Sequence, residues 1–322
     1  MSQPTVRQVH PVDAILTQIS VAYRQQLDHF ISSRVFPNVM VAKSSGKYVT
    51  YTKADWLRDE AKMRADSAES AGSGYPMSTD SYDCNVWALH KDIGDLVQAN
   101  ADSPINPVQD AAQFVIQRMM VQKEVQFATD YMATSIWDTD KTVTTKWSAA
   151  GSDPIGDIET GRETILASTG FLPNTLVLGY KTYKVLKHHS DIVDRIKYTG
   201  GLAEQMRTEV ILATLFDLSN VYVAKAIKNT GKEGGDSTIA QVNTTDVALL
   251  CYVAPSPSPL TPSAGYTFTW AGVSDGLGTD IGTVSFNMPE LGRNHVRVES
   301  QMAYDHKVVA TDLGYFFTDV VD

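Results

Sequence analysis

The stretch from residue 108 to residue 137 limits the possible folds of this chain most, because its 30 residues contain no proline or glycine. Pro104 and Pro107 stand just before it, where the first turn of a helix accepts proline. Apolar side chains recur along it at helical spacing, namely Val108, Ala112, Val115, Ile116, Met119, Met120, Phe127 and Tyr131. At ~1.5 Å per residue the helix would be roughly 45 Å long, whereas globular helices average ~11–12 residues. The pattern predicts an elongated molecule built around one spine helix.

Residues 43–91 predict a long two-stranded hairpin. Its strand-like runs, 47–52 and 82–90, carry strand-forming residues such as Tyr48, Val86 and Trp87. A charged segment at 53–69 and a break at Gly72-Ser73-Gly74 separate the two runs. A two-stranded hairpin alone is marginal in water. We therefore expect this hairpin to rest on another surface, either of its own chain or of a neighbouring subunit.

Helix and strand signals alternate after the spine. Asp153 or Asp157 opens a helix that Gly170 ends, and the apolar run at 245–254 favours a strand buried on both faces. The expected helices are 12–30, 108–137, 153–169 and 202–216, with a helix and a short helix after the strand 175–178 within residues 171–199. The expected strands are 175–178, 220–227, 245–254, 266–270, 281–287, 294–305, 306–311 and 315–321. A Gly-rich loop at 228–240 and a Pro-rich loop at 255–265 connect the later strands. The fold class is therefore α+β.

Charge and cysteine content exclude several classes of protein. The 27 basic and 37 acidic residues give a net charge of −10, which argues against a protein that wraps nucleic acid through phosphate contacts. Two cysteines, Cys84 and Cys251, are too few for a disulfide framework. No signal peptide and no membrane-spanning run is evident, so we expect a soluble intracellular product that contacts no membrane.

The sequence contains little that indicates catalysis. No phosphate-loop, GxSxG or HExxH pattern occurs. His188 and His189, with Asp191 and Asp194, form the one cluster that resembles a metal or acid–base site. Adjacent histidines on a helix point about 100° apart, which favours a solvated helix end over a chelating pair. We therefore expect no enzymatic activity, no metal and no cofactor.

Two segments resemble the major capsid proteins of tailed bacteriophages, which have the Hong Kong ninety-seven type fold that encapsulins share. The first is PNTLVLGYKTYKVLKHHSDIVDRIKYT, residues 173–199, which is similar to the axial-lobe segment of many phage capsid proteins. The second is MPELGRNHVRVESQMAYDHKVVATDLGYFFTDV, residues 288–320, with the family's phrase at Asp305, Lys307 and 312–315. The order of elements matches the family over nearly the whole chain.

The resemblance implies a division of the chain. It gives an N-terminal arm (1–40), an extended loop reaching over a neighbouring subunit (41–92), a peripheral lobe with the spine helix (93–150), an axial lobe (151–265), and C-terminal strands that are partly axial and then peripheral (266–322). The spine begins near residue 104, which leaves no room for a large N-terminal scaffolding region. Any scaffolding is therefore expected from a separate protein.

The resemblance also implies the function. The chain would assemble with itself into hexamers and pentamers of an icosahedral head shell in the virion, built in the host cytoplasm around weakly contacted double-stranded DNA. A portal and separate scaffolding or decoration proteins are its implied partners. Two alternatives stay open at this point, an encapsulin-like shell around protein cargo and a soluble hydrolase with an unrecognised site.

The candidate assembly interface combines the hairpin with the Gly-rich loop. The strand aromatics and the charged centre of the hairpin lack a core of their own, and the loop lies between two strong strands, where exposed connections are expected. The residues assigned to this interface are Tyr48, Tyr51, Trp56, Arg58, Glu60, Arg64, Trp87, Lys228 and Lys232.

Overall fold

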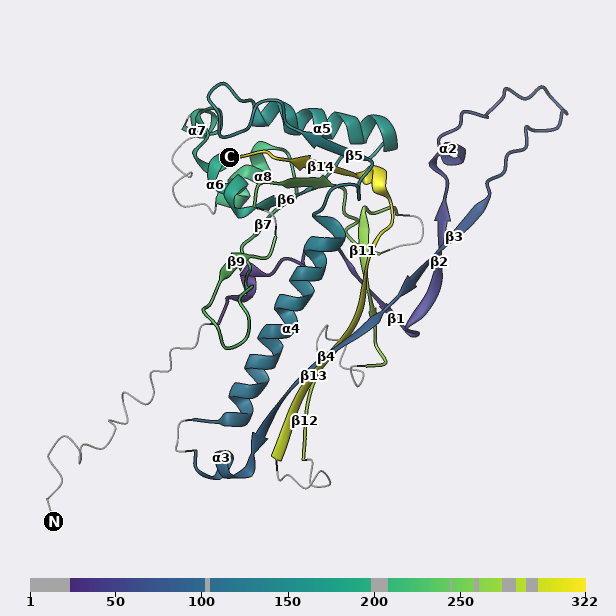
Figure 1. Ribbon diagram of the computed structural model, residues 1–322. Coiled ribbons are helices and arrows are strands. Elements are labelled where there is room, and N and C mark those ends of the chain that lie inside the picture. Colours follow the sequence, from purple (N-terminus) through teal and green to yellow (C-terminus); the bar gives the residue numbers. More distant parts are fainter. Residues whose placement is uncertain are drawn as a thin grey trace, which may run out of the picture.

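The computed structural model describes residues 24–101, 105–197, 208–243, 245–257, 261–273, 282–287 and 295–322. Figure 1 shows three parts: a compact lobe, a long helix that descends from it beside a long sheet, and a hairpin that projects sideways. We call the hairpin, residues 45–83, the arm. The molecule is elongated, as the length of the spine helix predicts.

The spine helix is α4 (Pro107–Tyr131), 25 residues long. Asn106 caps it by accepting the amide of Gln109 at 3.3 Å, and Pro107 occupies the first turn, where its missing N–H costs nothing. The helix ends at Tyr131, six residues before the predicted end at Trp137, which corrects that expectation. The Trp137 indole N–H donates to the Tyr131 carbonyl at 2.9 Å, so the chain turns back and satisfies a carbonyl that the helix end leaves free.

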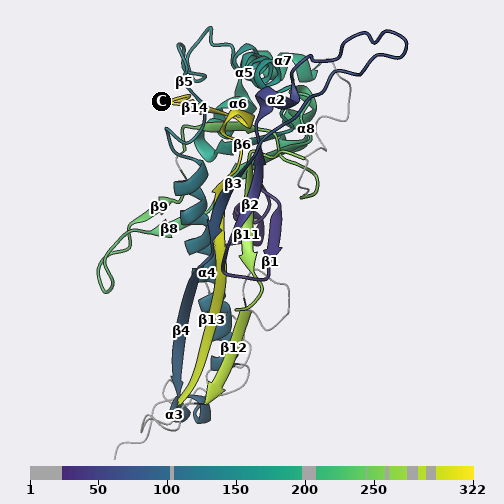
Figure 2. The same cartoon turned by 90° about the vertical axis from the view of Figure 1, so that its right-hand side faces the viewer.

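The long sheet lies against α4. Its strands are β1 (Asn38–Val41), β4 (Asn85–Gly94), β11 (Gly265–Trp270), β12 (Gly282–Asn287) and β13 (His295–Val308). β13 pairs with β4, β11 and β12, and Figure 2 shows β4, β13 and β12 running together along the helix. Val115 and Met119 of α4 pack on Met302 and Tyr304 of β13. The two strands expected at 294–305 and 306–311 are one strand.

The hairpin is shorter than predicted. β2 (Ser45–Tyr51) pairs with β3 (Met77–Asp83) from Ser45↔Asp83 to Tyr51↔Met77, whereas β4 pairs with β13 of the long sheet. The predicted strand at 82–90 therefore spans two strands of different sheets. The chain changes sheet at Cys84. This residue is 4% exposed and packs with Tyr266 and Phe268. Its backbone N–H donates to the Ser44 carbonyl at 2.8 Å.

The compact lobe contains a second five-stranded sheet, in the order β5-β14-β10-β6-β7. Every described residue of β6 and β10 is buried, as their apolar sequences predict. Asp153 caps α5 by accepting the Gly156 amide at 2.9 Å, and Gly170 ends that helix at φ 79°, both as expected. The elements are β5 (Thr139–Thr142), α5 (Pro154–Thr169), β6 (Thr175–Gly179), α6 (Tyr180–His188), α7 (Ser190–Lys197), α8 (Thr208–Leu215), β7 (Asn220–Ala224), β10 (Ala248–Cys251) and β14 (Gly314–Thr318).

The C-terminal strands are divided between the two sheets. β11, β12 and β13 belong to the long sheet, and β14 then returns to the compact lobe between β5 and β10. Phe316 and Phe317 of β14 are each 1% exposed, so burial of these rings in the lobe core holds the strand there. The assignment of residues 266–322 to axial and then peripheral strands stays a prediction.

Short elements complete the described chain. β8 (Ile227–Asn229) and β9 (Ile239–Gln241) form a small hairpin at the base of the predicted Gly-rich loop. The expected helix at 12–30 lies largely outside the described residues, and its described end holds only the 3-10 turn η1 (Leu27–His29). Residues 202–207 of another expected helix also lie outside them. The remaining elements are α2 (Lys53–Trp56), α3 (Asp95–Ala99) and η3 (Thr311–Leu313).

Candidate assembly interface

The base of the arm packs on its own chain. The Tyr48 ring stacks on Phe268 of β11 at 5.5 Å between centroids, and the Tyr82 ring stacks on the same phenylalanine at 4.7 Å. The Tyr48 hydroxyl donates to Asp80 across the hairpin at 2.9 Å. Burial and the Asp80 carboxylate raise the pKa of Tyr48, which keeps the phenol in its donating form. These contacts fix the direction in which the arm leaves the body.

Two ion pairs extend this attachment. Lys53, at the start of α2, contacts Asp312 of η3 at 2.6 Å, and Lys307 of β13 lies 3.5 Å from Asp80. Both pairs are partly exposed, and such pairs add orientation more than stability. The arm thus rests on its own chain up to Lys53. Its own chain is one of the two supporting surfaces that the sequence left open, the other being a neighbouring subunit.

On both sides of Lys53 in the sequence, the arm carries an aromatic cluster made of Tyr51, Trp56 and Tyr75. The three rings lie 5.4–5.9 Å apart between centroids. Trp56 remains 53% exposed and Tyr75 56% exposed. Burying one large aromatic side chain is worth roughly 1.5–3 kcal/mol, so this cluster leaves considerable free energy available to a partner surface.

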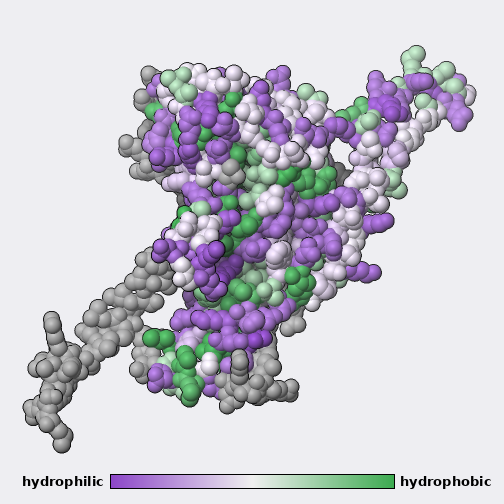
Figure 3. All heavy atoms as spheres, viewed as in Figure 1, coloured by the Kyte–Doolittle hydropathy of each residue, from purple (hydrophilic) through white to green (hydrophobic). Residues whose placement is uncertain are grey.

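The arm also carries charged side chains that pair with one another. Arg58 pairs with Asp55 at 3.2 Å and with Glu60 at 3.0 Å, and Arg64 donates to the carbonyl of Ala68. Hydrogen bonds from Ser73 and Arg58 hold the pKa of Glu60 below its ordinary value. These interactions remain within the arm, and Figure 3 shows the hydrophilic residues that gather at its far end.

Trp87 occupies a different place from the arm residues. It lies on β4 and packs, partly buried, against the cluster of Val115, Met119 and Tyr304, with its ring 6.5 Å from that of Tyr304. Trp87 therefore contributes to the contact between the long sheet and the spine, and the structure does not bring it together with the aromatic cluster.

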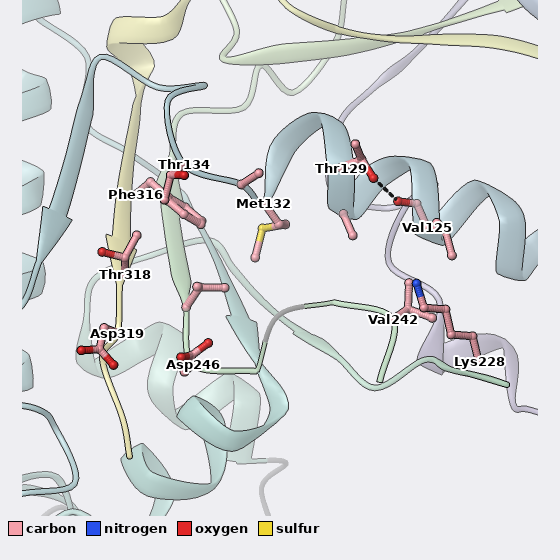
Figure 4. A pocket seen from close by; sticks show the side chains of 13 residues that line it. Val125, Thr129, Met132, Thr134, Lys228, Val242, Asp246, Phe316, Thr318 and Asp319 are labelled. Carbon is pink, nitrogen blue, oxygen red and sulfur yellow. Dashed lines mark hydrogen bonds between the residues drawn. The ribbon is translucent and has the colours of Figure 1, made fainter. Parts of the chain in front are cut away.

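Lys228 and Lys232 lie on the β8–β9 hairpin, which projects on the other side of α4 from the arm (Figure 1). Lys232 is exposed in the turn. Lys228 borders a groove of roughly 480 Å³ between the end of α4, the base of this hairpin and β14. Figure 4 shows Lys228 beside Val242, with Asp246, Thr318 and Asp319 farther along the groove. The sequence-predicted residues thus form two separate surfaces.

Several exposed apolar residues were not predicted from the sequence. On the arm these are Leu57, Met63 and Met77, which are 65%, 102% and 66% exposed. A second group, Leu96, Val97 and Ile105, lies beside the start of the spine helix, where Figure 3 shows apolar spheres at the lower end. Isolated apolar residues in charged or loop segments have no periodicity to reveal their exposure, so only the structure finds them.

The histidine cluster is accounted for by local contacts. His188 is exposed at the end of α6, and His189 lies 3.1 Å from the Ser152 hydroxyl and accepts the Asp191 amide at 3.3 Å. Among the described residues no group of three His, Cys, Asp or Glu side chains is placed to hold a metal ion. In the same part of the chain no helix is long and apolar enough to cross a membrane.

We expect both thiols to resist labelling in the native protein. Burial and the charges of Asp305 and Asp83 raise the pKa of Cys84 to about 11, and burial raises that of Cys251 further. At pH 8 roughly one thousandth of Cys84 is then thiolate, the reactive form. Treatment with a disulfide-exchange reagent should label native protein at least about 100-fold more slowly than urea-unfolded protein. Rapid labelling of the native chain would contradict this.

Solved structures show which fold this arrangement has. A phage-related protein from Bordetella bronchiseptica matches with a TM-score of 0.66 at 22% identity, covering 92% of this chain and 94% of that one. The capsid structure of cyanophage P-SCSP1u matches at 0.60 and 10% identity (93% and 90%). The holo encapsulin complex from Synechococcus elongatus matches at 0.56 and 10% identity (100% and 92%). The chain has the Hong Kong ninety-seven type fold, as predicted.

Sequence similarity shows which proteins of this fold the chain resembles. The major capsid protein of Burkholderia phage BcepMu is 28% identical over 271 residues, covering 80% of this chain and 82% of that protein. The major capsid protein of Pseudomonas phage JBD67 is 24% identical over 326 residues, covering 97% of each. No family model matches the sequence. The predicted resemblance to phage major capsid proteins is confirmed.

Proposed function

We propose that this protein is a structural major capsid protein, without enzymatic activity, that assembles with itself into the icosahedral shell of a phage head. The observation that carries the proposal is an arm that leaves its own chain at Lys53 and carries exposed aromatic residues beyond that point. Sequence similarity to two phage major capsid proteins over most of their length supports it. A subunit with such an arm is incomplete by itself, and a second copy supplies the missing contact.

The proposal also covers the arrangement of subunits in the shell and the contents of the shell. Hexamers and pentamers of this chain form the shell in the virion, after assembly in the host cytoplasm. Double-stranded DNA is the cargo, and the net charge of −10 keeps contact between shell and polyanion weak. A portal, and separate scaffolding or decoration proteins, complete the head.

An encapsulin-like compartment is the second candidate, because an encapsulin complex has the same fold at a TM-score of 0.56. The sequence similarity to phage major capsid proteins favours the head shell. The contents of the particle separate the two functions, since a phage head packages DNA and an encapsulin encloses protein.

Electron microscopy of the purified full-length protein tests the proposal directly. We expect closed icosahedral particles of megadalton mass on size-exclusion chromatography. Co-expression with the neighbouring phage genes should give particles whose DNA resists nuclease until the shell is opened. A protein that stays monomeric at all concentrations, both alone and in the co-expression, would refute the shell function. Particles filled with one protein cargo would establish the encapsulin alternative.

Charge reversal on the β8–β9 hairpin is expected to weaken the hexamers and pentamers. Lys232 is exposed in the turn, so Lys232→Glu should leave the melting temperature of the free subunit unchanged. It should also raise the protein concentration needed for assembly by about tenfold, which corresponds to ~1.4 kcal/mol. Light scattering during assembly measures this concentration.

Adding Lys228→Glu tests the second lysine of the hairpin, and Lys228→Arg with Lys232→Arg is the matched control. The reversal at Lys228 also brings a further negative charge near Asp246 and Asp319 of the groove, so the single Lys232 variant is the cleaner probe. Unchanged assembly after both reversals would mean that this hairpin does not lie at the axis of a hexamer or pentamer.

A further inference from the structure

A buried carboxylate in the middle of the spine helix holds two distant segments. Glu124 is completely buried. One of its oxygens accepts the amides of Ile31 and Ser32 at 3.1 and 3.0 Å, and the other accepts the side-chain amide of Asn243 at 3.0 Å. Residues 31–32 lie near the start of the described chain, and Asn243 follows the β8–β9 hairpin. One side chain of α4 therefore fixes both.

The groups that face Glu124 are all hydrogen-bond donors, so only an acceptor fits between them. Burial raises the pKa of Glu124, while the bonds from Ser32, Asn243 and Ile31 oppose that rise. The neighbouring Lys123 is also buried, donates to the Ser33 hydroxyl at 2.9 Å and lies 5.6 Å from the Tyr304 ring centroid. Two consecutive residues of the spine thus hold residues 31–33 through hydrogen bonds.

The same two segments also touch each other. The side-chain amide of Gln25 donates to the carbonyl of Ile227 at 2.7 Å and accepts its N–H at 2.9 Å, as a neighbouring strand would. Phe30 packs with Ala226 and Val242 in a small core that Met120 and Val125 of α4 complete. We call residues 24–33 the strap.

We propose that the strap and the β8–β9 hairpin form one coupled conformational unit, in which Glu124 is the shared positioning residue. A force or a partner that releases the strap then also releases the hairpin, on the opposite side of the spine from the arm. The coupling is reciprocal, because any change that loosens the hairpin must loosen the strap by the same factor. This inference concerns the single chain and does not depend on the shell function.

Amide hydrogen exchange on the full-length protein tests the coupling. Asn243→Ala removes a contact to Glu124 and touches neither Ile31 nor Ser32, yet we expect their amides to exchange at least about fivefold faster, the lower end of typical coupling. Gln25→Ala is the reciprocal variant. It should accelerate exchange at Val242, whose amide bonds to the Ala226 carbonyl at 2.9 Å. Glu124→Gln, which places a donor against donors, should accelerate exchange in both segments.

Gln126→Ala is the matched control, because that side chain lies on the same helix and pairs only with Asp130 in the contacts described, at 2.9 and 3.0 Å. It should leave exchange in both segments unchanged. Acceleration confined in each variant to the segment that carries the substitution would overturn the coupling. Should Glu124→Gln fail to fold, Asn243→Ala and Gln25→Ala still decide the question, since each alters one segment and is read at the other.

Discussion

Shells will not close when residues 54–76 are replaced by a short Gly-Ser turn, although the subunit itself stays folded. This replacement keeps the register of β2 and β3 from Ser45↔Asp83 to Tyr51↔Met77 and keeps the Lys53–Asp312 pair. It removes Trp56 and Tyr75, together with the exposed Leu57 and Met63. The variant thus lacks the part of the arm that its own chain does not support.

The expected effect is large because each copy loses several apolar contacts at once. Full burial of one large side chain is worth roughly 1.5–3 kcal/mol. Trp56 and Tyr75 are 53% and 56% exposed in the subunit, so the loss of the two rings together costs about 1.5–3 kcal/mol per contact. Every 1.4 kcal/mol is a factor of ten in affinity. We therefore expect the yield of closed particles to fall by at least about 100-fold, measured by electron microscopy and sedimentation, with unchanged circular dichroism and melting of the free subunit.

Point variants separate the apolar and the charged contributions of the arm. Trp56→Ala with Tyr75→Ala should reproduce most of the assembly defect, since exposed ion pairs add little. Lys62→Ala with Glu69→Ala, two exposed residues of the same tip, is the matched control and should assemble. Normal shells from the replacement of 54–76 would refute the role of the arm. An unfolded product would show instead that the tip packs on its own chain.

The sequence predicted those features of the fold that depend on neighbouring residues. Pro107 stands in the first turn of α4, and Asp153 and Gly170 delimit α5, because caps and turn residues act within a few positions. The end of α4 was not predictable, since it depends on the Trp137 side chain returning to the Tyr131 carbonyl. No local pattern distinguishes that return from another helical turn.

Strand partners were the least predictable part. Trp87 pairs with Met302, 215 positions away, and β14 enters the compact lobe between β5 and β10. An alternating or apolar run fixes which face of a strand is buried and leaves its partner open. The same limit applies to the candidate interface. The charged tip could be predicted from residues 53–69. The contact of Trp56 with Tyr75 and the pair of Lys53 with Asp312 arise only from tertiary structure.

Trp147→Ala is expected to cost the compact lobe about 3–5 kcal/mol, the range for removal of a large buried aromatic side chain. Trp147 is 1% exposed, with its ring 5.7 Å from that of Phe317. Its indole N–H donates to Asp157 of α5 at 2.8 Å, and its backbone amide donates to Val320 at 2.7 Å. The residue therefore joins α5, β14 and the C-terminal segment, three parts of the lobe that are distant in sequence.

Trp147→Phe is the matched control for this substitution. It retains most of the aromatic volume and loses the hydrogen bond to Asp157, so the expected cost is about 1–2 kcal/mol. Urea unfolding of the unassembled subunit, followed by circular dichroism, measures both values as shifts of the midpoint at constant slope. Equal costs for the two variants would mean that the hydrogen bond, and not the packing on Phe317, holds the lobe at this point. A cost below about 1 kcal/mol for Trp147→Ala would show that the C-terminal segment closes the lobe without it.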